Sequence, residues 1–214
     1  MNLGQIRTAA YARAGLPSSD SFFDSSTMNS LVNQANAMFE SEADWPWLET
    51  SATQTLTGGT STITAPADFL RTITIRVTGS PNELAFRSLT WLDDMATYVG
   101  EPNWYGHSGP SIIILPSPVT NRSILHRYIR VAPDLASDSD TPLSPSVFHQ
   151  AIIEYATYLI HTRQQDDASA EKRMAAYNLW ITKAKARAGL ESPTAGGGVP
   201  LSVANTDVDR AGQA

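Results

Sequence analysis

The sequence contains no cysteine, which excludes disulfide frameworks, thiolate metal sites and cysteine nucleophiles. It has no apolar run close to the roughly 18 residues of a membrane span. The residues after Met1 lack a charged stretch followed by a long apolar one, so no signal peptide is predicted. Charged residues make up only 17% of the chain, below the typical quarter or so. We therefore expect a surface with unusually little charge.

Hydroxyl side chains take the place of the missing charge. Ser and Thr make up roughly a fifth of the chain, whose 214 residues suit one substantial domain or one domain with an appendage. Apolar residues reach 42%, which excludes wholesale disorder. A surface made of hydroxyl groups suggests that much of it contacts other protein.

The charges that are present are unevenly distributed. The net charge of −6 argues against a general nucleic-acid binder, whose domain is usually basic. No Lys or Arg occurs between Arg13 and Arg71, whereas all three lysines lie between residues 172 and 185. Two interpretations stay open: ordinary solvated faces, or complementary faces that meet between copies in an assembly.

Hydrophobic periodicity predicts helices at both ends of the chain and strands between them. Helices are expected at 3–14, from Thr27 (as cap) to 43–45, from 145 with Ser144 as cap, and at 168–188. Strands are expected at 51–56 and 60–64, joined as a hairpin around Gly58-Gly59, and at 70–77, 111–115 and 123–131, with a short helix at 88–98.

This order predicts the α+β class: an antiparallel bundle of four main helices with an inserted antiparallel β domain and an extended C-terminal arm. Residues 1–49 and 144–189 would form the bundle, 50–143 the inserted β-rich domain and 190–214 the arm. The arm contains Pro193, Gly196-Gly197-Gly198 and Pro200 without a periodic apolar face, a linker composition. We expect it to be disordered alone and ordered by a partner.

Catalytic and metal-binding patterns are weak. His107-Ser108 lies in Gly106–Gly109, which lacks the spacing of a nucleophile elbow. Asp134, Asp138 and Asp140 share a loop, but without the central glycine of a calcium loop. His149 and His161 are too far apart on one helix to share a metal, and no phosphate-binding glycine loop is present. No catalytic, cofactor-binding or metal site is predicted, and the chain is not expected to be an enzyme.

Five tryptophans allow a second interpretation. Trp91 and Trp104, together with Tyr105, could form a carbohydrate- or receptor-binding surface on the central sheet. Packing in a core or in a protein interface is the preferred explanation, because aromatic residues are enriched at such interfaces. A hydrolase that uses Ser108 and His107 is a remote third possibility.

Several short motifs occur in an order that resembles a known family. Pro66-Ala-Asp-Phe-Leu70 leads into a strand, Gly100-Glu-Pro-Asn-Trp-Tyr105 precedes a short apolar strand that ends at Leu115-Pro-Ser-Pro118, and Pro142-Leu-Ser-Pro145 opens a helix pair. Over roughly residues 1 to 188 the chain resembles the head-to-tail adaptor (connector) proteins of tailed bacteriophages, and is similar to the tail tubular protein A group.

The resemblance implies a structural role in the virion. Such adaptors form a homo-oligomeric ring, commonly dodecameric, beneath the portal protein. They extend the DNA channel, through which packaged DNA passes without specific binding, and they provide a platform for tail or neck proteins. The implied location is the neck of the virion, and the host cytoplasm during assembly, with no membrane association.

Three groups of residues are candidates for the contacts of such a ring. The first is a portal-binding arm: Glu191, Pro193, Val199, Pro200, Leu201, Val203, Val208 and Arg210. The second is a basic face of the last helix that meets another subunit or the portal: Lys172, Arg173, Trp180, Lys183 and Arg187. The third is an acidic group that lines the channel or an interface: Glu40, Glu42 and Asp44.

Overall fold

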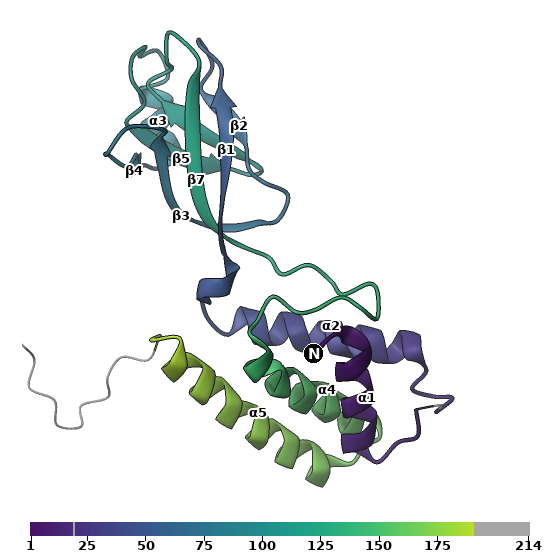
Figure 1. The fold of residues 1–214 in the computed structure, drawn as a ribbon. Helices are drawn as coiled ribbons and strands as arrows, with labels where there is room; N and C mark the ends of the chain where they lie inside the picture. The colour runs from purple at the N-terminus through teal and green to yellow at the C-terminus, as the bar shows by residue number, and fades with distance from the viewer. Residues whose placement is uncertain (19, 191–214) are drawn as a thin grey trace, which may run out of the picture.

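The computed structural model describes residues 1–18 and 20–190, which form two lobes (Figure 1). The helical lobe consists of residues 1–18, 20–48 and 131–190, and the β lobe consists of residues 49–130. The core of the helical lobe also includes Ile129 of β7, and a second core lies within the β lobe; the two cores share no residue. The chain belongs to the α+β class, as predicted.

The first two helices follow strong capping signals. Helix α1 (Leu3–Ala14) begins with a capping box, in which Asn2 and Gln5 exchange hydrogen bonds, and ends at Gly15, whose φ of 70° is left-handed. These bounds are the predicted ones. Helix α2 (Ser25–Ser41) begins earlier than predicted, because the Asp24 carboxylate accepts a hydrogen bond from the Thr27 amide at 2.7 Å. Thr27 is therefore inside the helix, and Asp24 is its N-cap.

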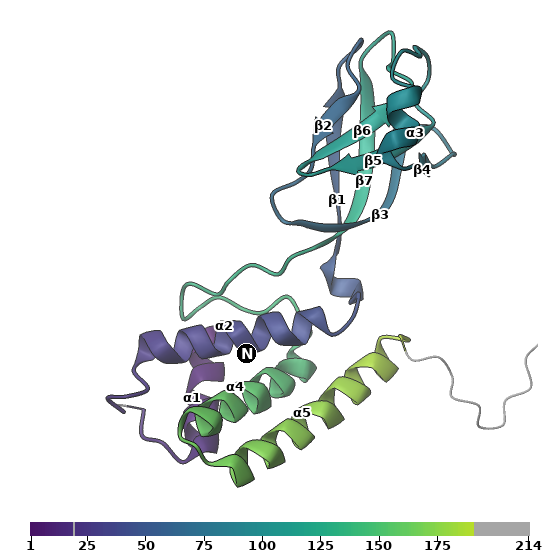
Figure 2. The same ribbon diagram turned by 180° about the vertical axis from the view of Figure 1, so that it is seen from behind.

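The last two helices pack side by side. Helix α4 (His149–Arg163) follows the short 3-10 helix η2 (Ser146–Phe148), and α5 (Asp167–Arg187) starts at the N-cap Asp166. Ser144 was predicted to cap α4, but its side chain does not do so. Its carbonyl accepts a hydrogen bond from the His149 ring at 2.9 Å. Both views place α4 and α5 next to each other in the helical lobe (Figure 2).

Helix α4 is the centre of the helical lobe. Helices α1, α2 and α5 all pack against it, and its buried residues point in nearly every direction around the axis. The sequence predicts a single apolar stripe through Ile152 and Ala156, but Ile153 and Ile160 are equally buried. A helix that is apolar on most sides is typical of a core position.

The β lobe contains two sheets. One has the strand order β1-β7-β3, with β1 (Glu49–Leu56), β7 (Arg122–Arg130) and β3 (Phe69–Val77) all antiparallel. The other has the order β2-β6-β5-β4, with β2 (Thr62–Thr64), β6 (Ser111–Leu115), β5 (Trp104–Ser108) and β4 (Ala85–Phe86). Because β4 and β5 run parallel, the prediction of an entirely antiparallel β domain is wrong.

The predicted hairpin around Gly58-Gly59 is also wrong. Strands β1 and β2 belong to different sheets. The Gly58 amide donates to the Asn121 side chain at 2.9 Å, and the Gly59 amide donates to the Pro118 carbonyl at 2.7 Å. The glycine turn is therefore bonded to the loop before β7 and carries the chain from one sheet to the other.

A bulge breaks the predicted alternation of β3. The register of β3 against β7 shifts between Thr72 and Thr74, so two residues oppose one partner. Ile73, which the sequence places on the same face as the buried Ile75, is displaced to the exposed side. Thr72 is turned inward in its place and contacts two histidines.

The lobes are joined by two chain crossings. The 3-10 helix η1 (Pro46–Leu48) leads into β1, and segment 131–143 returns from β7 along the helical lobe (Figure 1). The Leu135 side chain lies in the helical core, and Asn33 of α2 bonds both the amide and the carbonyl of Leu135. Segment 131–143 therefore packs with the helices.

Helix α3 (Leu89–Asp94) covers β5 only because Gly106 has no side chain. A Cβ atom at Gly106 would lie 2.6 Å from Leu92 Cδ1 and 2.8 Å from the Arg87 carbonyl oxygen. The latter contact is with backbone, which cannot rotate away. At Gly100, by contrast, a Cβ would meet only the Pro116 side chain, at 3.8 Å or more.

We predict that Gly106→Ala destabilises the β lobe by about 1 to 3 kcal/mol through overpacking, whereas Gly100→Ala leaves its stability nearly unchanged. Urea unfolding followed by tryptophan fluorescence measures the difference, since Trp91 and Trp104 of the β lobe contribute to the signal beside Trp45, Trp47 and Trp180 of the helical lobe. Equal unfolding midpoints for the two variants would show that α3 does not pack on β5 as described.

Candidate functional site

Most residues of the predicted basic face lie on the outer side of α5. Lys172, Lys183 and Arg187 are exposed, and the Lys183 ammonium lies 4.9 Å from the centre of the half-buried Trp180 ring. Helix α5 packs on α4 and leaves this side uncovered (Figure 2). These four residues therefore form one accessible surface with a positive potential.

Arg173 does not belong to that surface. Its guanidinium lies 3.4 Å from the Glu154 carboxylate in α4, which also bonds Arg13 of α1. Glu154 is buried, and Arg13 and Arg173 supply the opposite charge that a buried carboxylate needs. Arg173 is therefore a structural residue of the helical lobe, and its assignment to the basic face is wrong.

The three acidic residues near the end of α2 do not form a common surface. Glu40 is 6% exposed, and one of its carboxylate oxygens accepts a hydrogen bond from the Trp47 indole at 2.8 Å. Burial is the main cause that raises the pKa of Glu40 to about 7. Glu40 cannot line a channel or interface from this position.

Glu42 and Asp44 have partners on two different elements. Glu42 bonds Lys185 of α5 at 3.3 Å and accepts a hydrogen bond from the Tyr177 hydroxyl at 3.5 Å. Asp44 forms an ion pair with Arg71 of β3, the one ion pair between the two lobes in the described part of the chain. These contacts explain why acidic side chains stand at the unfavourable end of the helix dipole.

Trp91, Trp104 and Tyr105 do not form the flat aromatic surface that carbohydrate binding would need. Tyr105 is buried in the core of the β lobe. Trp91 and Trp104 are in contact, but their rings meet at 70° with centroids 4.9 Å apart, and Arg87 lies over the Trp91 ring at 5.4 Å. Perpendicular rings, one of them covered by a guanidinium, form no flat platform for a sugar.

The side chains of His107 and Ser108 do not point towards one position at which a substrate could bind. Successive residues of a strand point to opposite faces; Ser108 is exposed, while the His107 ring is turned towards Thr72. The Thr72 hydroxyl lies 3.0 Å from His107 Nε2 and 2.9 Å from His126 Nε2. Burial, followed by the neighbouring His107, lowers the pKa of His126 to about 4. The buried His126 ring is therefore neutral near neutral pH, with the half-buried His107 ring beside it.

Asp138 and Asp140 hold the 134–140 loop in place. Asp138 pairs with Arg7 of α1 through two hydrogen bonds of 2.8 Å. The Asp140 carboxylate accepts from the amides of Ala136 and Ser137. Within residues 1–18 and 20–190, no three His, Cys, Asp or Glu side chains converge as a metal site would require.

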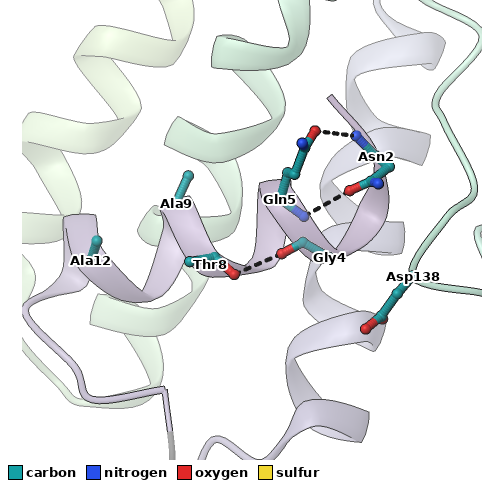
Figure 3. Close-up of a pocket in the computed structure, with 7 residues that line it drawn as sticks. All are labelled: Asn2, Gly4, Gln5, Thr8, Ala9, Ala12 and Asp138. Atoms are coloured by element: carbon teal, nitrogen blue, oxygen red, sulfur yellow. Dashed lines mark hydrogen bonds between the residues drawn. The ribbon is translucent and has the colours of Figure 1, made fainter.

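Two outward surfaces were not predicted from the sequence. One is a shallow groove along α1, lined by Asn2, Gly4, Gln5, Thr8, Ala9, Ala12 and Asp138 (Figure 3). The other is Leu179 on α5, which is 55% exposed beside the basic residues. Gly4, Thr8 and Ala12 are spaced four residues apart, which places them on one side of α1. This spacing is the feature of the sequence that could have predicted the groove.

The predicted portal-binding arm lies outside the described residues, from Glu191 through Arg210. In the described part of the chain, no helix has the length and apolarity needed to cross a membrane.

The comparison with protein families gives the decisive result. The model of the SU10 adaptor protein family matches residues 1–203. The chain belongs to the SU10 adaptor protein family. This confirms the resemblance to phage head-to-tail adaptors and assigns a structural role in the virion neck. The SU10 adaptor match also extends beyond Leu190, through six of the predicted arm residues: Glu191, Pro193, Val199, Pro200, Leu201 and Val203. No curated protein matches this sequence.

The buried Glu40 gives a prediction about pH. Its pKa in the folded state is about 7, above the ordinary 4.5, so its contribution to stability is complete below about pH 4.5 and is lost as the pH rises through 7. We predict that wild type loses about 2 to 3 kcal/mol more than Glu40→Gln between about pH 5 and about pH 8.

Urea unfolding of both proteins at the two pH values measures this difference. The comparison cancels the opposite effect of His126, whose lowered pKa makes acid destabilising. Parallel pH profiles for wild type and the variant would contradict the buried position of Glu40.

Proposed function

We propose that this chain is one subunit of a ring, dodecameric as in the adaptors it resembles, that binds beneath the portal protein. The ring extends the DNA channel and provides the platform to which tail or neck proteins bind. The observation that carries this proposal is the match to the SU10 adaptor protein family over residues 1–203. Assembly takes place in the host cytoplasm.

The arrangement of the lobes supports a ring. A closed ring with head-to-tail contacts needs two different surfaces on each copy. The helical lobe offers the basic face of α5 and the groove of α1, which lie on different helices packed around α4. The β lobe projects from this body through two chain crossings (Figure 1) and is free to contact the next component of the neck.

The charge of the chain suits a channel through which DNA passes. A net charge of −6 repels the phosphate backbone, which basic proteins attract and hold. Three exposed basic residues, Lys172, Lys183 and Arg187, lie on α5, where we place contacts with protein. In the described part of the chain the other exposed basic residues are spread over the β lobe and the end of α4: Arg71, Arg87, Arg127 and Arg163. We therefore propose that DNA moves through the ring without specific binding.

Residues 191–214 are proposed as the arm that binds the portal. Their composition, with Pro193, Pro200 and three consecutive glycines, is that of a segment that gains order on binding. The family match continues to residue 203, which places the first half of the arm within the shared part of the sequence.

The proposed function predicts a complex of defined stoichiometry. The purified full-length chain, mixed with the portal ring of the same phage, should form a complex whose mass corresponds to one adaptor copy per portal subunit. Light scattering after size-exclusion chromatography measures this mass. If the two proteins elute separately at every ratio, the proposed function is wrong.

The arm gives a second prediction. Deletion of residues 191–214 should abolish copurification with the portal, whereas deletion of 204–214, beyond the family match, should retain it. Both variants keep the whole described helical lobe, so the loss cannot come from unfolding. Portal binding by the longer deletion would disprove the arm hypothesis without affecting the adaptor role.

A further inference from the structure

An exposed stripe runs along the outer side of α5. It consists of Lys172, Ala175, Leu179, Lys183 and Ala186, all exposed and spaced so that they share one helix face. A large aliphatic side chain is at its centre, small residues flank it, and a lysine lies towards each end. Such a face resembles the contact surface of a packed helix more than a solvated one, yet nothing in the described chain covers it.

The groove on α1 has the complementary shape. Gly4, Thr8 and Ala12 lie along one side of the helix, with the Asp138 side chain at the first turn (Figure 3). The groove is mostly apolar, shallow and open to the outside. Small residues allow the axis of a second helix to approach closely, so the groove can receive a large central side chain such as Leu179.

The two surfaces also match in length and charge. The α5 stripe extends over about 21 Å and α1 over about 18 Å at 1.5 Å per residue. At the groove, Asp138 is paired with Arg7 of α1, and Asp140, whose carbonyl accepts from the Leu3 amide at 2.8 Å, adds a further negative charge. The stripe carries two lysines, and Arg187 lies beside it. Opposite charges around an apolar centre fix the register of a protein interface.

One chain cannot bring the two surfaces together. Both α1 and α5 pack on α4. In each helix the residues that face α4 are buried, among them Ile6 and Ala10 in α1 and Tyr177 and Ile181 in α5. The groove and the stripe are on the opposite sides of their helices and point outward. Two different outward surfaces allow a head-to-tail contact between copies, and such contacts close into a ring when the rotation between copies permits it.

We propose that the α5 stripe of one copy docks into the α1 groove of the next copy, with Leu179 seated between Gly4, Thr8 and Ala12. This contact rests on the proposed ring and specifies which helices form it. Each copy uses its α1 groove for one neighbour and its α5 stripe for the other. A pair of copies therefore leaves one groove and one stripe free to bind further copies.

The absence of cysteine allows a direct test by disulfide trapping. Full-length Thr8→Cys and Leu179→Cys proteins, one of them carrying a size tag, are mixed with portal rings and oxidised. A disulfide requires Cα atoms within about 7 Å, so a mixed dimer should appear on a non-reducing gel. Ser30→Cys, at an exposed position of α2 in the same lobe, replaces Thr8→Cys in the control and should lose that dimer.

The outcomes separate this contact from the ring itself. Portal complexes that form without the Thr8–Leu179 dimer, or with an equal yield of the Ser30–Leu179 dimer, would overturn the proposed contact and leave the adaptor ring intact. Absence of any portal complex for the wild-type chain would overturn both.

A second variant tests the groove without cysteine chemistry. Ala12→Phe fills the groove at an exposed position, and it should prevent assembly on the portal while retaining the wild-type thermal unfolding. Ala37→Phe, at an exposed position of α2 outside the groove, is the matched control and should leave assembly unchanged. Assembly of Ala12→Phe at the wild-type level would contradict the docking of α5 in this groove.

Discussion

The burial of α4 is the constraint on which the helical lobe depends. A helix packed against α1, α2 and α5 buries polar side chains as well as apolar ones, among them the carboxylate of Glu154. Leaving such a charge without partners costs several kcal/mol, and the partners Arg13 and Arg173 come from α1 and α5. These two helices must therefore be in place together. The lobe behaves as one body whose outer surfaces are held at fixed positions, which is what a subunit of a ring requires.

The β lobe is attached to this body by a small junction. Asp44 and Arg71 form the ion pair across it, and Phe39, Trp45, Trp47 and Phe148 form a cluster of aromatic rings at the adjacent end of the helical core. Two independent cores joined in this way allow one lobe to make the contacts of the ring while the other contacts a different component. The division of roles follows from the separation of the cores rather than from any catalytic feature.

Local signals in the sequence were sufficient for most helices and for the α+β class. The bounds of α1 follow from Asn2 and Gly15, and β6 follows from its apolar run. Contacts between residues far apart in the sequence were not predictable. The Gly58-Gly59 turn forms hydrogen bonds with residues more than 50 positions away, and the bulge in β3 depends on where Thr72 meets two histidines. For the same reason, Arg173 and Glu40 were placed on surfaces although their partners, Glu154 and Trp47, draw them inward.

The central claim is that the outer faces of α1 and α5 are the surfaces by which copies of this adaptor meet. Electron cryo-microscopy of the full-length chain assembled on its portal tests it most directly. The account predicts density for α5 of each copy against α1 of the next, with the β lobes directed away from that contact. Rings in which α1 and α5 both face solvent or the lumen, with copies joined through the β lobes, would contradict it.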